Sequence, residues 1–221
     1  RTGVSFDDDA HLRAIMKRML GDAGAELRDD EPIIETGLLI GDRRVSISLT
    51  MPPISPYVHV DMRLHPPQAP TLDDLLADEF MTPEAGHLLH AILRSRYGFI
   101  VVGEPESGKT TLLNALLLQV PLDGAVAVER TGELQLPDSI IRRMARWPVG
   151  SEPGVTFGQQ IDSALCDRPT VLILDEVRAD EPVTILPLLT QEPSPRQIWS
   201  VRGVPDAKRL QSSLGMLARR A

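Results

Sequence analysis

The chain has 221 residues, a formal net charge of −8 and a single cysteine, Cys166. This length can bury a substantial core in one large domain or two small ones. The negative charge argues against a protein that holds nucleic acid by general electrostatics, because such binding needs Lys and Arg to neutralise phosphates. One cysteine excludes an internal disulfide framework, and the histidines, His87 and His90 included, show no metal-ligand spacing.

The first predicted element is an amphipathic helix that begins after three aspartates, residues 7–9. Apolar residues then recur three and four apart, and the carboxylates lie at the positive end of the helix. Strands are predicted over 33–40, 44–51 and 57–64, because apolar and polar residues alternate there as in strands buried on one face. Residues 1–65 are therefore predicted to form a small α+β domain.

A proline-rich linker is predicted at residues 66–70, within the sequence HPPQAP. Its three prolines can continue neither a helix nor a central strand. The second predicted domain runs over 71–221 and begins with a capping box at Thr71 and Asp74. Another helix is predicted to begin at Thr82, which precedes Pro83.

Strands and helices alternate in this second domain. Strands are predicted at 99–103, 125–129, 171–175 and 197–201, and helices at 109–119, 156–166 and 180–190. Continuous apolar runs suit parallel strands covered on both faces, and the long connections suit right-handed crossovers. The predicted fold class is α/β.

A phosphate-binding loop is predicted between the first of these strands and the helix that follows it. Glycines at both ends let backbone N–H groups turn toward phosphate oxygens, and the positive end of the helix points at the same place. Lys109 is predicted to reach the β and γ phosphates, and the Thr110 hydroxyl to bind Mg²⁺. A chance pattern in an ordinary turn is the alternative, and the strand, loop and helix order disfavours it. The predicted nucleotide-binding residues are Gly103, Glu104, Pro105, Glu106, Ser107, Gly108, Lys109, Thr110 and Thr111.

Acidic residues follow two other predicted strands. Asp175 and Glu176 end the run VLILDEV, at the edge where open α/β sheets hold ligands. Asp175 is predicted to hold Mg²⁺, and Glu176 to orient or deprotonate the attacking water. Glu129 ends another strand, with Glu133 just beyond, and is predicted to face the γ-phosphate if that strand neighbours the loop. Solvated acids at strand ends are the alternative in both places.

The chain resembles the ATPases of type II and type IV secretion and pilus assembly, nearest the Tad-type (tight adherence) pilus ATPases. The resemblance rests on the order and spacing of FDDDAHLRAIMKRML, EPIIETGLLIGDRRVSISLTMPP, TLDDLL, GEPESGKTTLLNALL, VERTGELQLP and VTFGQQIDSALCDRPTVLILDEVRADEP. It implies a PAS-like amino-terminal domain, a flexible linker and a RecA-like motor that binds ATP and Mg²⁺.

Several residue roles follow from this resemblance. Glu129 matches the first catalytic acid of the family and Glu176 its Walker B glutamate, while Arg178 and Glu181 match later motif positions. Arg63 matches an arginine that approaches nucleotide across the domain cleft. The resemblance also implies a homohexameric ring, and further strands and helices beyond Ala221.

Five positions depart from the family pattern. Arg130 stands where members usually carry aspartate, and Asp175 where they carry glycine. Arg202 replaces the histidine of the histidine box in IWSVRGVP, which makes it a candidate γ-phosphate sensor. Asp162 and Cys166 also replace usual arginines.

The leading functional hypothesis is an ATP-hydrolysing motor subunit of a bacterial secretion or pilus-assembly system, working with an inner-membrane platform protein. The alternative is a diverged paralogue that binds nucleotide with little or no hydrolysis and acts as an assembly or regulatory module. A nucleic-acid motor is a third class, disfavoured because 4% aromatic residues offer no stacking platform. No run approaches the roughly 20 apolar residues of a membrane span, and no signal peptide is recognised. We therefore expect a cytoplasmic protein, and the family resemblance implies that it is peripheral at the inner face of the cell membrane.

Overall fold

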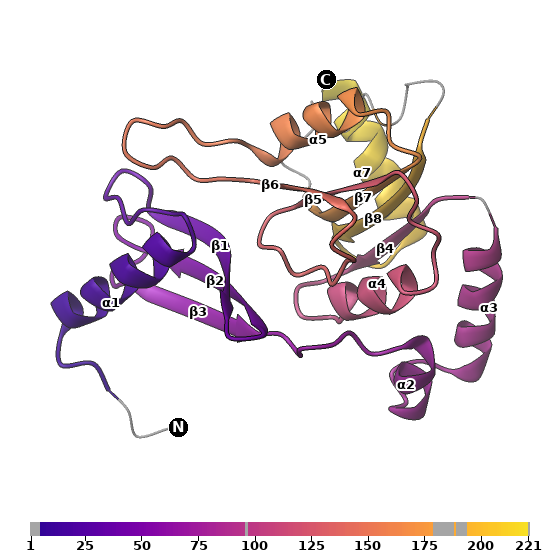
Figure 1. Ribbon diagram of the computed structural model, residues 1–221, viewed down its shortest axis with the longest axis horizontal. Helices are drawn as coiled ribbons and strands as arrows, with labels where there is room; N and C mark the ends of the chain where they lie inside the picture. The colour runs from indigo at the N-terminus through magenta and orange to yellow at the C-terminus, as the bar shows by residue number, and fades with distance from the viewer. Residues whose placement is uncertain (1–4, 96, 179–187, 189–193, 221) are drawn as a thin grey trace. The chain divides into compact units, whose positions relative to one another are not determined.

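The computed structural model describes residues 5–95, 97–178, 188 and 194–220 (Figure 1). The chain divides into two compact units. Unit 1 contains residues 1–67 together with 130–133 and 145–156, and unit 2 contains the remainder. No described helix is long and apolar enough to cross a bilayer.

Unit 1 packs one helix on an antiparallel sheet. Helix α1 (Asp9–Asp22) begins where the Asp8 carboxylate accepts a hydrogen bond from the His11 amide. Strands β1 (Ile33–Ile40), β2 (Arg43–Thr50) and β3 (His59–Leu64) lie in the order β1-β2-β3. Alternate residues of β2 are buried against α1, as its alternating sequence predicts, and the three predicted strands are confirmed.

Two segments from much later in the chain also belong to unit 1. The Trp147 indole N–H donates to the Glu35 carbonyl at 2.6 Å. The Arg44 guanidinium donates to the Gly132 carbonyl at 3.2 Å. Gly37 permits this packing, because a Cβ there would lie 1.8 Å from the Thr131 carbonyl oxygen. Sequence analysis did not predict this contribution to the small sheet.

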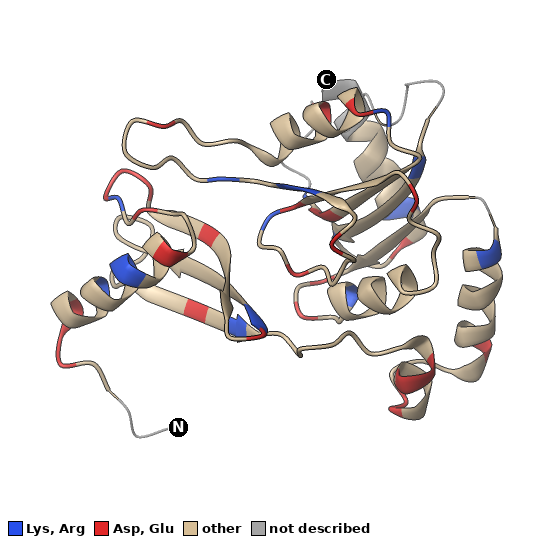
Figure 2. Cartoon of the chain, viewed as in Figure 1, with Lys and Arg blue, Asp and Glu red and all other residues tan. Residues whose placement is uncertain are grey.

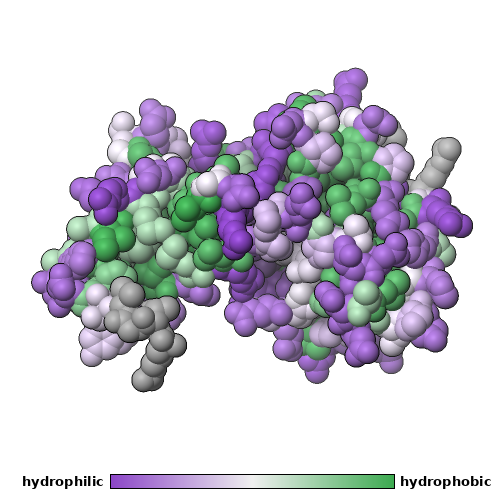
Figure 3. Space-filling model, turned by 60° about the horizontal axis from the view of Figure 1, so that its bottom comes forward, coloured by the Kyte–Doolittle hydropathy of each residue, from purple (hydrophilic) through white to green (hydrophobic). Residues whose placement is uncertain are grey.

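The end strand β3 leaves large apolar side chains exposed. Met62 and Leu64 lie outside the core beneath α1 and are exposed, as are Leu39 and Ile40 of β1. Figure 3 shows apolar side chains, in green, gathered on the visible face of this unit. Helix α1 therefore covers only part of its sheet.

Unit 2 begins with two capped helices. In α2 (Leu72–Ala77) the Thr71 hydroxyl accepts from the Asp74 amide, and the Asp74 carboxylate accepts from the Thr71 amide. Helix α3 (Pro83–Arg94) is capped by the Thr82 hydroxyl. Both predicted starts are confirmed. Apolar residues of both helices join the core beneath the larger sheet.

The larger sheet is parallel throughout its described strands, so the α/β prediction is confirmed. Its order is β4-β8-β7-β5-β6. The predicted strands correspond to β4 (Phe99–Gly103), β5 (Ala125–Glu129), β7 (Val171–Val177) and β8 (Arg196–Arg202). Strand β6 (Ile141–Met144) was not predicted.

Helices cover both faces of this sheet (Figure 1). Helix α4 (Lys109–Leu117) packs with α2 and α3 on one face, and α5 (Phe157–Cys166) and α7 (Ala207–Arg220) lie on the other. Helices α4 and α5 match two predicted helices. The third, predicted at 180–190, falls outside the described residues apart from Leu188, and α7 was not predicted.

Candidate functional site

The predicted phosphate loop connects β4 to α4 within unit 2. Gly103 is the last residue of β4, and a Cβ there would lie 2.3 Å from the Ser107 hydroxyl. Gly108 has a φ of +83° and precedes the first residue of α4. A side chain at Gly108 would also meet the Phe80 ring at 2.7 Å. Both glycines are thus required by the tight path of the loop.

Lys109 lies over this loop. Its side chain is buried, and its Nζ donates to the Glu104 carbonyl at 2.8 Å. Thr110 and Thr111 follow in the first turn of α4, where Gly108 supplies no side-chain cap. Figure 2 shows acidic residues in the loop and a basic residue where α4 begins. The ammonium group and the positive end of the helix therefore face the same loop, which suits an anionic ligand.

The carboxyl ends of β4, β7 and β8 meet at one edge of the sheet. Gly103 at the end of β4 pairs in register with Arg202 at the end of β8. Strand β8 also pairs with β7, which carries Asp175 and Glu176. The structure thereby brings Arg202 and both acids to the edge that carries the loop, as sequence analysis predicted for the acids.

Two guanidinium groups surround the Glu176 carboxylate. Arg178 Nε donates to Glu176 Oε1 at 3.1 Å, and Arg202 Nη1 lies 3.9 Å from the same oxygen. About a quarter of the Glu176 side chain is exposed (28%), against 48% for Arg202. Both guanidinium groups therefore lie beside the same carboxylate oxygen. Asp175, one residue earlier, is 3% exposed.

Glu129 is fully buried and fixed by strong hydrogen bonds. Its Oε1 accepts from Arg142 Nε at 2.7 Å and lies 2.6 Å from Arg142 Nη2. Its Oε2 accepts from the Leu134 amide at 2.9 Å. Strand β5 neighbours β7 in the sheet, which places Glu129 near the end occupied by Asp175. The carboxylate of Glu129 is therefore engaged in holding the 134–142 segment.

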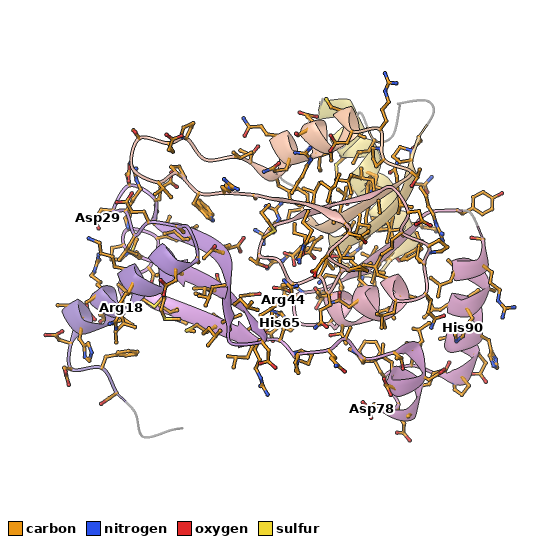
Figure 4. All side chains as sticks on the ribbon, in the orientation of Figure 1. Arg18, Asp29, Arg44, His65, Asp78 and His90 are labelled. Atoms are coloured by element: carbon orange, nitrogen blue, oxygen red, sulfur yellow. The ribbon has the colours of Figure 1, made fainter. Side chains whose placement is uncertain are left out.

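Arg63 and Glu133 belong to unit 1. Arg63 lies on β3 opposite Ser46 of β2. The Ser46 hydroxyl donates to Glu133 Oε1 at 2.6 Å and lies 2.7 Å from His65 Nε2. Figure 4 labels Arg44 and His65, which are joined by a hydrogen bond from the His65 amide to the Arg44 carbonyl. The role of Arg63 toward nucleotide stays a prediction.

Two residues of the larger sheet contact the acids although they were not predicted from the sequence. Ser200 is a buried hydroxyl in the apolar run of β8, and it contacts the backbone of Glu176. Arg142 lies on β6 and holds Glu129. A polar residue inside the short run IWSV was the available signal for Ser200. No local signal linked Arg142 to an acid 13 residues earlier.

The residues present fit a nucleotide with Mg²⁺. Hydroxyl and carboxylate oxygens such as those of Thr110 and Asp175 are ligands that Mg²⁺ prefers. Among the described residues, no cluster of three His, Cys, Asp or Glu side chains forms a metal site by itself. Mg²⁺ commonly binds one or two protein oxygens together with substrate phosphates, and this donor set is consistent with that mode.

Comparisons with known proteins support the resemblance. The family model described as "Type II/IV secretion system protein" matches residues 2–188. The chain is 31% identical over 199 residues to a putative conjugal transfer protein, MT3759, of Mycobacterium tuberculosis, covering 86% of this chain and 56% of that protein. It is 26% identical over 185 residues to the type IV secretion system protein VirB11 of Brucella suis, covering 71% and 50%.

A solved structure also matches. The fold is similar to the X-ray structure of the Legionella pneumophila ATPase DotB, with a TM-score of 0.61 and 14% identity over 95% of this chain and 58% of that one. The chain spans about half the length of the curated relatives that it matches. These matches support the wider superfamily, and the narrower resemblance to Tad-type ATPases stays a prediction.

Proposed function

Because the chain belongs to the type II/IV secretion system protein family, we propose that it is an ATP-binding and ATP-hydrolysing motor subunit of a bacterial secretion or pilus-assembly system. The observation that carries this proposal is the shared sheet edge, where the loop from Gly103 to Thr110 meets Asp175 and Glu176. Ligands of parallel α/β sheets bind at such carboxyl edges. The position of β8 between β4 and β7 also supports the RecA-like assignment of this domain.

Each residue of the proposed site has a physical role. The loop amides and Lys109 bind the phosphates, since Lys109 already lies buried over the loop. Thr110 and Asp175 would hold Mg²⁺, which supplies positive charge to neutralise the phosphate oxygens. Glu176 orients the attacking water.

The alternative, a nucleotide-binding module with little or no hydrolysis, is favoured by the charges around the two acids. Arg178 and Arg202 flank Glu176, and Arg142 engages Glu129. An arginine cannot accept a proton, so Arg202 does not replace the contacts of a neutral histidine. Hydrolysis by this chain is therefore proposed to be slow.

A Mg²⁺-dependent phosphate-release assay separates the two functions. The motor requires wild type to release phosphate faster than Glu176→Gln while both bind Mg-ATP with similar affinity. Lys109→Ala serves as the binding control, because it removes the charge placed against the β and γ phosphates. If wild type is no faster than Glu176→Gln, even at concentrations that permit rings, the nucleotide-binding module replaces the motor.

The partners follow from the family and are proposals for this chain. We propose a homohexamer that acts on an inner-membrane platform protein, with the PAS-like unit 1 carrying Arg63 toward the nucleotide. The chain is proposed to be cytoplasmic and peripheral at the inner face of the membrane. Sizing with and without Mg-ATP tests the ring, and a monomer under both conditions contradicts it. Nucleic acid is not proposed as a partner, since the chain carries a net charge of −8.

A further inference from the structure

The strand that carries Glu176 is interrupted by a bulge. Leu174 of β7 pairs with Trp199 of β8, whereas the next pair joins Val177 to Val201. Two residues of β7, Asp175 and Glu176, therefore lie opposite one residue of β8, Ser200. Such a bulge disrupts the local ladder of hydrogen bonds and redirects the side chains of the bulged strand.

The backbone of Glu176 is held in an unfavourable conformation at this bulge. Its φ is +52°, in the left-handed region that residues with a Cβ rarely adopt. Conformations of this kind persist only where the surrounding structure holds them. At Glu176 the amide N–H donates to the Ser200 hydroxyl at 3.1 Å, and Ser200 is completely buried. The Ser200 hydroxyl oxygen thus accepts the hydrogen bond of the Glu176 amide at the point where the strand register shifts.

We propose that Ser200 is a positioning residue for Glu176. By accepting the Glu176 amide proton, the hydroxyl holds the bulge and sets the direction in which the carboxylate leaves the sheet edge. Ser200 acts through the backbone of Glu176 and binds neither nucleotide nor metal. The inference rests on the proposed function, in which Glu176 orients the attacking water. It adds Ser200 as the residue that keeps Glu176 in place.

A matched pair of substitutions isolates the hydroxyl. Ser200→Thr and Ser200→Val have nearly the same volume and shape, but only threonine keeps an acceptor oxygen. Misplacement of a reacting group by about 1 Å costs on the order of 100-fold in rate. We therefore expect kcat for Ser200→Val to fall about 10- to 100-fold below that of Ser200→Thr, with KM for Mg-ATP changed by less than about threefold. Ser200→Ala, which adds no atoms, is the second hydroxyl-free variant if the larger side chains prevent folding.

Hydrogen exchange of the Glu176 amide tests the contact without any turnover. The amide is expected to lose at least about tenfold in protection in Ser200→Val, and to keep it in Ser200→Thr, because only the first loses its acceptor. Equal protection in the two variants overturns the inference. Equal kcat in Ser200→Val and Ser200→Thr also overturns it. So does a loss of Mg-ATP affinity in Ser200→Val that is as large as its loss of kcat. If wild type is no faster than Glu176→Gln, the proposed function fails and the positioning role fails with it. If wild type is faster than Glu176→Gln but Ser200→Thr and Ser200→Val have equal kcat, only the positioning role of Ser200 is refuted.

Discussion

The buried ion pair between Glu129 and Arg142 makes the sharpest prediction about stability. Arg142→Met removes the guanidinium contacts to Glu129, at 2.7 Å from Nε and 2.6 Å from Nη2, while the fully buried carboxylate keeps its hydrogen bond from the Leu134 amide. Hydrogen bonds to charged groups contribute about 1.5–3 kcal/mol each. Breaking a buried pair from one side costs about 3–5 kcal/mol. We expect Arg142→Met to lower the free energy of unfolding by about that amount.

The neighbouring residue supplies a matched control. Arg143 lies on the same strand and pairs with Asp167 at 2.6 Å. The two arginines are similarly exposed (23% and 26%), but Asp167 is 32% exposed whereas Glu129 is fully buried. Exposed pairs contribute about 0–1 kcal/mol, so Arg143→Met should cost far less. Urea denaturation of the two variants measures the difference. The double variant Glu129→Met, Arg142→Met should recover much of the loss, because no unpaired charge remains buried.

These variants also separate two roles for Glu129. If the acid chiefly holds the 134–142 segment, Glu129→Gln should cost more in free energy of unfolding than it adds to the activation free energy of phosphate release per folded molecule. Equal costs for Arg142→Met and Arg143→Met would refute the reasoning. So would additive effects of Glu129→Met and Arg142→Met, since interacting residues show a coupling energy in such a cycle.

Three further predictions concern other contacts. Gly37→Ala should destabilise unit 1 by about 1–3 kcal/mol in urea denaturation, since its Cβ would overlap the Thr131 carbonyl, whereas Gly21→Ala meets no atom within 4 Å and should not destabilise. The pKa of Asp74 is lowered by hydrogen bonds from the Thr71 amide and hydroxyl, so the cap stabilises above the ordinary aspartate pKa and is lost as pH falls through the lowered value. Thr71→Ala should raise the pKa of Asp74 in an NMR titration, and an unchanged value would contradict the hydroxyl's part. Arg202→His should accelerate phosphate release if the altered histidine box limits turnover; a slower variant would instead show that the guanidinium assists.

The conformation of the loop from Gly103 to Thr110 could be predicted because its determinants are local. Gly103 and Gly108 are required by the path of a few consecutive residues, and Lys109 follows directly. Four of the described strands of the larger sheet, β4, β5, β7 and β8, were also predictable, since each contains a short run of apolar residues. Strand β6 escaped because its sequence, IRRM, is half arginine. In the folded protein those arginines form ion pairs with Glu129 and Asp167, which lie elsewhere in the chain and are not visible in the local sequence.

The surroundings of the acids could not be predicted, because they depend on strand order. Strand β8 inserts between β4 and β7, although it follows both in the chain. That order places Ser200 beside Glu176, and Arg202 beside both Glu176 and Gly103, across 24 or more residues. The contribution of residues 145–156 to unit 1 is likewise a long-range contact that no local pattern encodes.

The two functional hypotheses thus differ in which partner the arginines prefer. Arg178 Nε lies 3.1 Å and Arg202 Nη1 lies 3.9 Å from the same oxygen of the Glu176 carboxylate. A γ-phosphate carries more negative charge and binds guanidinium in a bidentate manner, so it competes with the carboxylate for the same donors. If the arginines bind the γ-phosphate instead of Glu176, the Glu176 carboxylate can orient water while Ser200 holds its backbone in place. The chain can then act as a motor. If the arginines remain paired with Glu176, the site binds ATP without hydrolysing it. A partner protein would then respond to nucleotide binding rather than to hydrolysis.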